Sequence, residues 1–282
     1  MTRTPTSPSS PHRATRRGAA LTGLGAALAA AFVLVPPAVA TTTFGGGLHG
    51  RQQLARAART AFLEYWTSGQ RAYSPALDQV VESWSRYHVV KAVMAALLLV
   101  VLVRLAQVIG HAPPGSRLVR RIVHTSAGAV VAGLAGFSAL LLMANVQGAV
   151  APFASLLPVV ADGATGPVAV ALDEAGATLT EGTGSEAWTA PLDAMLADFT
   201  RYHLAMAGLS GAATAALVAT AVLLRRRRTG ASAGVPHARR VLVPAWLLAT
   251  SGALATALLA AANLSTAAHP AVALATALDG GW

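Results

Sequence analysis

Residues 74–88 read SPALDQVVESWSRYH and residues 189–203 read TAPLDAMLADFTRYH, so both stretches end in Arg-Tyr-His at the entrance to a long apolar run. Ser74 and Thr189, with a Pro close behind each, have the pattern of a helix N-cap and first turn. Apolar side chains then recur at the spacing i, i+3, i+4, i+7, which predicts one apolar face on each helix. The predicted apolar positions are Leu77, Val80, Val81 and Trp84 in the first stretch, and Leu192, Met195, Leu196 and Phe199 in the second. The acids between them, Asp78, Glu82, Asp193 and Asp198, are expected to face water.

Four apolar runs, residues 89–109, 122–144, 204–224 and 241–262, have the length of membrane spans. About 20 apolar residues are needed for a helix to cross the hydrocarbon core of a bilayer. The whole chain is 54% hydrophobic and 11% charged, with a mean hydropathy of +0.55, whereas about a quarter of the residues in a soluble domain are charged. We therefore predict an all-α, polytopic membrane protein with a four-helix transmembrane bundle.

The similarity between the two stretches continues beyond the first span of each. In both halves a basic turn ends in Arg-Arg, a second span follows and closes with Ala-Asn, and a Pro comes seven residues after that Asn. The sequence therefore predicts a tandem duplication of a two-helix hairpin. We place the first copy at residues 74–158 and the second at 189–276, with a linker at 159–188 and a C-terminal tail at 277–282.

A fifth apolar run, residues 18–35, follows a pair of arginines and leads to the small residues that end at Ala40. Residues 1–40 are either a secretory signal peptide cleaved after Ala40 or a signal anchor retained as a fifth transmembrane helix. Both interpretations place residues 41–73 outside the cytoplasm, where they form a further amphipathic segment.

The distribution of charge predicts the orientation in the membrane, because cytoplasmic loops are enriched in Lys and Arg. With the N-terminus inside, 14 of the 21 cations lie on the cytoplasmic side and all 11 acids lie outside. We expect a multi-pass protein of the plasma membrane with a cytoplasmic N-terminus, if uncleaved, and an extracytoplasmic C-terminus. The excess of Arg over Lys in an Ala-rich chain is typical of a GC-rich bacterial genome.

The two Arg-Tyr-His triplets hold the candidate site residues. The imidazoles of His88 and His203 could be the axial ligands of a b-type haem. We favour the alternative that each triplet is an anchor at the membrane interface, where aromatic rings and arginines contact headgroups. The arginine block after the third span would contact anionic lipid. The predicted interface and lipid residues are Arg86, Tyr87, Arg201, Tyr202, Arg225, Arg226, Arg227 and Arg228.

Three further patterns bear on packing. Asn145 and Asn263 are interpreted as ends of helices before a Pro rather than as hydrogen-bonding groups within the bundle. Small residues four apart predict where helices touch, residues 89–109 are expected to face lipid, and residues 163–184 are expected to be irregular. The small-residue ridges are Gly128, Ala132 and Gly136, then Gly208, Ala212 and Ala216, then Gly252, Thr256 and Ala260.

The functional hypotheses follow from what the chain contains. There is no Cys, which excludes disulfides and thiolate metal sites, and the cations form short clusters rather than the patch of a nucleic-acid-binding domain. We expect a non-catalytic structural, interaction or assembly component without a cofactor. Its partners would be membrane lipids and another membrane or extracytoplasmic protein. The alternatives are a redox protein holding haem through His88 and His203, and a subunit of an oligomeric transporter or channel.

Overall fold

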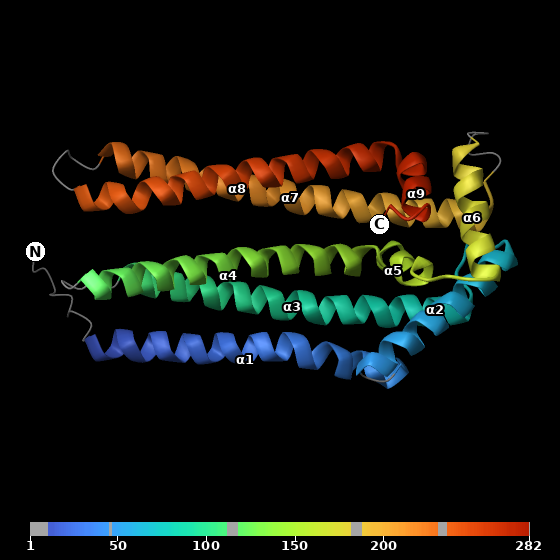
Figure 1. The fold of residues 1–282 in the computed structure, drawn as a ribbon, viewed down its shortest axis with the longest axis horizontal. Helices are drawn as coiled ribbons and strands as arrows, with labels where there is room; N and C mark the ends of the chain where they lie inside the picture. Colours follow the sequence, from blue (N-terminus) through green and yellow to red (C-terminus); the bar gives the residue numbers. More distant parts are fainter. Residues whose placement is uncertain (1–10, 45–46, 112–117, 182–187, 231–235, 282) are drawn as a thin grey trace, which may run out of the picture. The chain divides into compact units, whose positions relative to one another are not determined.

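The computed structural model describes residues 11–44, 47–111, 118–181, 188–230 and 236–281 (Figure 1). Every regular element in these ranges is an α-helix, which confirms the predicted all-α fold class. The helices are α1 (Pro11–Phe44), α2 (Gly47–Ser68), α3 (Pro75–His111), α4 (Leu118–Val150), α5 (Pro152–Ala161), α6 (Pro167–Thr180), α7 (Ala190–Gly230), α8 (Pro236–Ala268) and α9 (Pro270–Leu278).

Five of the described helices are long and apolar enough to cross a membrane, which indicates a multi-pass membrane protein. The apolar stretches are Arg16–Pro36 in α1, Pro75–Gly110 in α3, Ile122–Val150 in α4, Ala190–Thr229 in α7 and Leu242–Ala268 in α8. α3 has 37 residues and α7 has 41. At 1.5 Å per residue these helices are about 55 and 60 Å long, about twice the thickness of the hydrocarbon core. A large part of each therefore extends beyond the apolar layer of a bilayer.

The chain forms two compact units, of which unit 1 comprises residues 1–50 and 86–145 and unit 2 comprises residues 51–85 and 146–282. In unit 1, parts of α1, α3 and α4 pack around a small apolar core. A β-carbon added to Gly25 of α1 would lie 3.7 Å from a side-chain carbon of Val101, so α1 approaches α3 closely there. The core of unit 1 contains buried Leu102, Leu105 and Val131, packed against Leu21, Leu98, Ala106, Ile109 and Ala135. Cleavage of the chain after Ala40 stays a prediction.

The span in α3 was expected to face lipid, but one side of it is buried within the protein. Leu102 and Leu105 are buried in the core of unit 1, whereas Val93, Leu97 and Val100 are exposed. These two sets lie on different faces of the helix because a residue advances about 100° around its axis. Contact of the exposed side with lipid stays a prediction.

In unit 2, α7 packs along α8, α5 packs against α7, and α9 packs against α6 (Figure 1). The predicted apolar faces of both repeated stretches are buried, although Trp84 is only half-buried. Their burial brings together large side chains from four helices. Among the largest fully buried side chains are Phe62 and Tyr65 of α2, Leu77 of α3, Phe153 of α5, and Leu192 and Met195 of α7.

Both predicted N-caps are confirmed. The Leu77 N–H donates to Ser74 Oγ over 3.3 Å, and the Leu192 N–H donates to Thr189 Oγ1 over 3.4 Å. Each hydroxyl satisfies one of the backbone donors that the first turn of a helix leaves without an intrahelical partner.

Two sequence predictions about packing are wrong. Residues 163–184 were expected to be irregular, but α6 occupies much of this range, and its apolar face, which includes Val168 and Leu172, is buried. The second prediction, on the small-residue ridges, is wrong in part, since no atom of the described residues lies within 4 Å of a β-carbon added to Gly136 of α4 or Gly208 of α7. A β-carbon added to Gly128 of α4 lies 3.8 Å from a side-chain carbon of Ile109 on α3, and one added to Gly252 of α8 lies 3.3 Å from a side-chain carbon of Leu217 on α7. Small residues permit close approach, but the neighbouring helix decides whether it occurs.

Candidate functional site

The two Arg-Tyr-His triplets occupy the same register on α3 and α7. α7 begins at Ala190, 115 residues after α3 begins at Pro75, and His203 follows His88 by the same interval. α8 and α9 begin 118 residues after α4 and α5. A residue on α3, α4 or α5 can therefore be compared with its counterpart on α7, α8 or α9.

Each His contacts an Asn of the helix that follows. His88 Nδ1 lies 3.1 Å from Asn145 Oδ1, between α3 and α4 of unit 1. His203 Nδ1 lies 2.9 Å from Asn263 Oδ1, between α7 and α8 of unit 2. The same bond thus links the two long helices in each half of the chain.

The second hydrogen bond of each Asn fixes which atoms donate. Asn145 Nδ2 donates to the Leu141 carbonyl over 2.7 Å, and Asn263 Nδ2 donates to the Leu259 carbonyl over 2.9 Å. The Oδ1 atom that faces the imidazole can only accept, so Nδ1 of a neutral His must carry the proton. In this tautomer the lone pair of the ring belongs to Nε2.

The interpretation of both Asn residues as ends of helices is wrong. α4 continues to Val150 and α8 continues to Ala268, so each Asn lies five residues before the end of its helix. Asn145 is 5% exposed and Asn263 is 9% exposed. A buried amide requires hydrogen-bond partners, and the His on the preceding long helix supplies one in each case.

The predicted interface residues differ in their contacts within the protein. Arg201 Nη1 donates to Asp198 Oδ1 over 2.8 Å, although the Arg201 side chain is 59% exposed. The backbone carbonyl of Tyr202 accepts from Gln147, and the hydroxyl of Tyr87 accepts from Lys91. Contact between these residues, or Arg86, and lipid stays a prediction.

The arginine block stands at the end of α7, in its last turns. Arg225, Arg226 and Arg227 are exposed, and the guanidinium carbon of Arg228 lies 5.2 Å from the centre of the Trp246 ring on α8. Cations are favoured at this end of a helix because its last carbonyl groups carry partial negative charge.

Asp198 does not face water, contrary to the sequence prediction, since it is only 3% exposed. Its Oδ2 accepts the backbone N–H of Ala154, in the first turn of α5, over 2.9 Å. The residue before α5, Ala151, provides no side-chain cap. The carboxylate therefore caps α5 from another helix, where the positive end of the helix dipole favours an anion, and Arg201 balances its charge.

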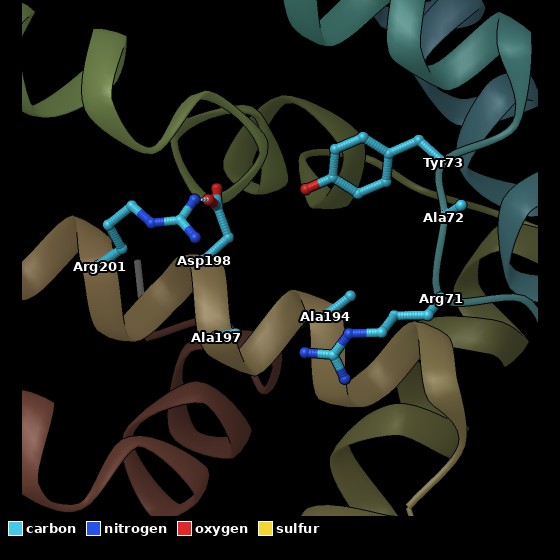
Figure 2. Close-up of a pocket in the computed structure, with 7 residues that line it drawn as sticks. All are labelled: Arg71, Ala72, Tyr73, Ala194, Ala197, Asp198 and Arg201. Carbon is cyan, nitrogen blue, oxygen red and sulfur yellow. Dashed lines mark hydrogen bonds and ion pairs between the residues drawn. The ribbon is translucent and has the colours of Figure 1, made fainter.

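A pocket of about 260 Å³ lies beside Asp198 in unit 2 (Figure 2). The segment between α2 and α3 forms one side of it and the first part of α7 forms the other. Figure 2 shows the hydroxyl of Tyr73 pointing toward the side where Asp198 and Arg201 lie. The salt bridge from Arg71 to Asp193 joins the segment to α7. The lining residues are Arg71, Ala72, Tyr73, Ala194, Ala197, Asp198 and Arg201.

An aromatic cluster holds the segment that carries Tyr73. The rings of Tyr65, Tyr73 and Phe153 meet edge to face, with centroids 5.3 to 6.0 Å apart. Tyr65 also donates its hydroxyl to the Arg71 carbonyl over 3.2 Å. Burial raises the pKa of Tyr65 to about 12, and burial followed by the nearby Asp198 carboxylate raises the pKa of Tyr73 further. Both phenols therefore remain protonated and able to donate a hydrogen bond at neutral pH.

Sequence reasoning missed Arg71 and Tyr73, although the repeat held a signal. Residues 69–73 read GQRAY and residues 184–188 read GSEAW, so the similarity begins upstream of Ser74. The two stretches share the Gly, the Ala and an aromatic residue, but Arg71 stands where the second copy has Glu186. The side chain at this position therefore has opposite charge in the two stretches.

In the part of the chain that the structure describes, no group of three or more His, Asp or Glu side chains could hold a metal ion. Comparisons with protein-family models, characterised proteins and solved structures find no match.

Proposed function

We propose that this chain is a multi-pass protein of the bacterial plasma membrane that acts as a non-catalytic binding or assembly component. The binding surface would be the outer layer, by which we mean α2, α5, α6, α9 and the first parts of α3 and α7 (residues 75–85 and 190–203). The observation that carries the proposal is the packed core of this layer. Large side chains such as Tyr65, Phe153 and Met195 are fully buried there, which gives a rigid surface at the end of α7 that begins at Ala190.

The helix boundaries support a duplicated hairpin as the origin of this arrangement. Corresponding helices begin at constant intervals, and both copies have the same N-cap and the same His–Asn bond. In this proposal each Arg-Tyr-His triplet is an interface anchor whose His also joins two spans. Interhelical hydrogen bonds of this kind stabilise membrane bundles by about 0.6 to 2 kcal/mol each.

The proposed orientation places the outer layer outside the cytoplasm. The acids of the described ranges lie in or beside the outer layer, while Arg225–Arg228 lie at the opposite end of α7. Arginine-rich segments are retained in the cytoplasm. The N-terminus would then be cytoplasmic, if uncleaved, and the C-terminus extracytoplasmic.

Fusion reporters test this orientation directly. A reporter that is active only after export would be fused after Arg228 in one fusion protein and after Leu278 in another, with a cytoplasmic reporter at the same sites as the matched pair. We expect export activity at Leu278 only. Export of the fusion at Arg228, or recovery of the chain without detergent, would contradict the proposal.

A haem-binding redox function is the second candidate, and one observation favours it. In each His–Asn pair the proton sits on Nδ1, and a metal-ligating His commonly donates one ring nitrogen to a neighbouring acceptor in this way. The purified protein would then show a Soret band that is lost in the double variant His88→Ala, His203→Ala. If protein purified from cells supplied with haem shows no Soret band, haem binding is rejected, and the two His residues keep only their structural function of joining helices.

A further inference from the structure

We propose that the pocket between residues 71–73 and α7 binds a phosphate group, carried by a phospholipid headgroup or by a soluble phosphate ester. This inference deepens the proposed function, because it names the ligand chemistry of the outer layer. The inference rests on the proposed function in one respect, which is the proposed position of the pocket relative to the membrane.

The hydrogen-bond donors of the pocket suit an oxyanion. Arg71 and Arg201 line it from opposite walls, and each contacts a carboxylate through Nη1. A guanidinium has five N–H donors in a planar fork, which matches the oxygen atoms of a phosphate. The hydroxyl of Tyr73 adds a neutral donor that points toward the side where Asp198 and Arg201 lie (Figure 2).

The acidic group in the lining is already occupied. Asp198 accepts from the Ala154 N–H with one oxygen and from Arg201 with the other. The lining thus contains two guanidinium groups and one carboxylate, and the carboxylate also faces the positive end of α5. Asp193, beside the pocket, is paired with Arg71. The two ion pairs balance in charge, but each arginine uses only one of its five N–H donors in its pair. The lining is therefore richer in hydrogen-bond donors than in acceptors, which favours an anion over a cation.

The space in the pocket comes from small side chains on one face of α7. Ala194 and Ala197 form its floor. Ala194 is four residues before Asp198 and Ala197 is four residues before Arg201, so all four positions lie on the same side of the helix. The volume of about 260 Å³ is below the range of about 300 to 1,000 Å³ that drug-sized ligands occupy. It suits a phosphate with a few attached atoms, such as glycerol phosphate.

The place of the pocket along α7 favours a lipid as the source of the phosphate. Arg201 is three residues before the start of the predicted span at residue 204, a distance of about 5 Å along a helix. The headgroup region on each side of a bilayer is about 5 to 8 Å deep. Arg201 would therefore lie at the level of the lipid phosphates.

Calorimetric titration of the full chain, purified in a phosphate-free non-ionic detergent, tests the proposal. The probes are glycerol phosphate and short-chain phosphatidylglycerol. We expect saturable binding to one site, weakened about 10-fold or more by Arg71→Gln and by Arg201→Gln, since each removes charge-assisted hydrogen bonds. Arg86→Gln, the counterpart of Arg201 in the first copy, is the matched control and should bind like the unaltered protein.

A second variant keeps the test decisive if Arg201→Gln fails to fold because Asp198 loses its partner. Ala197→Leu fills the floor without changing any charge, and residue 197 is exposed, so the fold should tolerate it. We expect this variant to lose binding while it unfolds at an unchanged temperature. Tighter binding of the lipid than of glycerol phosphate would identify the membrane as the source, and equal binding would identify a soluble ester.

Three results would overturn the proposal. The first is no saturable binding of either probe, and the second is binding by the Arg71, Arg201 and Ala197 variants as tight as that of the unaltered protein. The third is a loss of binding only when Arg225–Arg228 are replaced by Gln. These outcomes are independent of the reporter fusions. An exported fusion at Arg228 with intact phosphate binding would reject the orientation and keep the site, whereas the reverse combination would reject the site alone.

Discussion

The helix pair α3 and α4 and the helix pair α7 and α8 are alike in what holds them together and differ in what they expose. Both have a hydroxyl N-cap and a His–Asn bond at the same register. The face of α7 that lines the pocket carries Ala194, Ala197, Asp198 and Arg201. The corresponding positions of α3 hold Gln79, Glu82, Ser83 and Arg86.

The two helix pairs share the bonds that hold their helices together, and they differ on the face that lines the pocket. The N-cap and the His–Asn bond occur in both pairs. The pocket face differs because long side chains at positions 79 and 82 would occupy the space that alanines leave open at 194 and 197. Asp198 also caps α5. The corresponding residue of α3, Ser83, is uncharged and cannot make the same electrostatic interaction with a helix dipole.

The largest expected effect comes from removing that carboxylate. Asp198→Ala would leave the Ala154 N–H buried without its acceptor and would remove the partner of Arg201. We expect the free energy of unfolding to fall by about 3 kcal/mol, because the loss of charged hydrogen bonds adds to the cost of a buried donor without an acceptor. Ser83→Ala, the matched change in α3, should cost about 1 kcal/mol. Denaturant titration in detergent measures both, and equal losses would remove the distinction between the copies.

The contact between α7 and α8 provides the next test. A leucine at Gly252 would collide with Leu217, which already lies 3.3 Å from the added β-carbon. Gly252→Leu should lower the free energy of unfolding by about 2 kcal/mol through overpacking. Gly136→Leu on α4 meets no neighbour within 4 Å and should change it by less than about 0.5 kcal/mol. Similar melting temperatures for the two variants would show that α8 does not pack through this glycine.

The His–Asn bonds test the similarity of the two copies. We expect His88→Ala and His203→Ala to lower the free energy of unfolding by similar amounts, about 1 kcal/mol each. Double-mutant cycles with Asn145→Ala and Asn263→Ala should give coupling energies of about 0.6 to 1.7 kcal/mol in both copies. A coupling energy near zero in one copy alone would mean that its imidazole serves another purpose.

The smallest expected effect concerns hydroxyl groups deeper in the two helix pairs. Ser138 Oγ donates to the Ala95 carbonyl over 2.9 Å, and Thr214 Oγ1 donates to Thr256 Oγ1 over 2.8 Å. Ser138→Ala and Thr214→Val should each cost about 0.6 kcal/mol. Thermal unfolding in detergent measures both changes, and a loss above about 2 kcal/mol would contradict a purely local bond.

Much of the fold follows from periodicity. The apolar faces through Leu77 and Leu192 and the N-caps at Ser74 and Thr189 were predicted correctly, because helix spacing and capping depend on nearby residues. The His–Asn bonds and the burial of Asp198 were not predicted. Each joins residues more than 40 positions apart in the sequence, and local patterns contain no information on which distant polar groups meet.

The sequence by itself determined that the chain is helical and apolar enough to cross a membrane several times, because these properties depend on composition and spacing along each segment. It also marked Arg-Tyr-His as a repeated feature. Only the tertiary structure decided that each His meets an Asn, that Asp198 caps α5, and that Arg71 and Arg201 line one pocket. Such contacts depend on how separate helices pack, and Gly136 of α4 and Gly208 of α7 show that a small side chain alone does not bring a neighbour close.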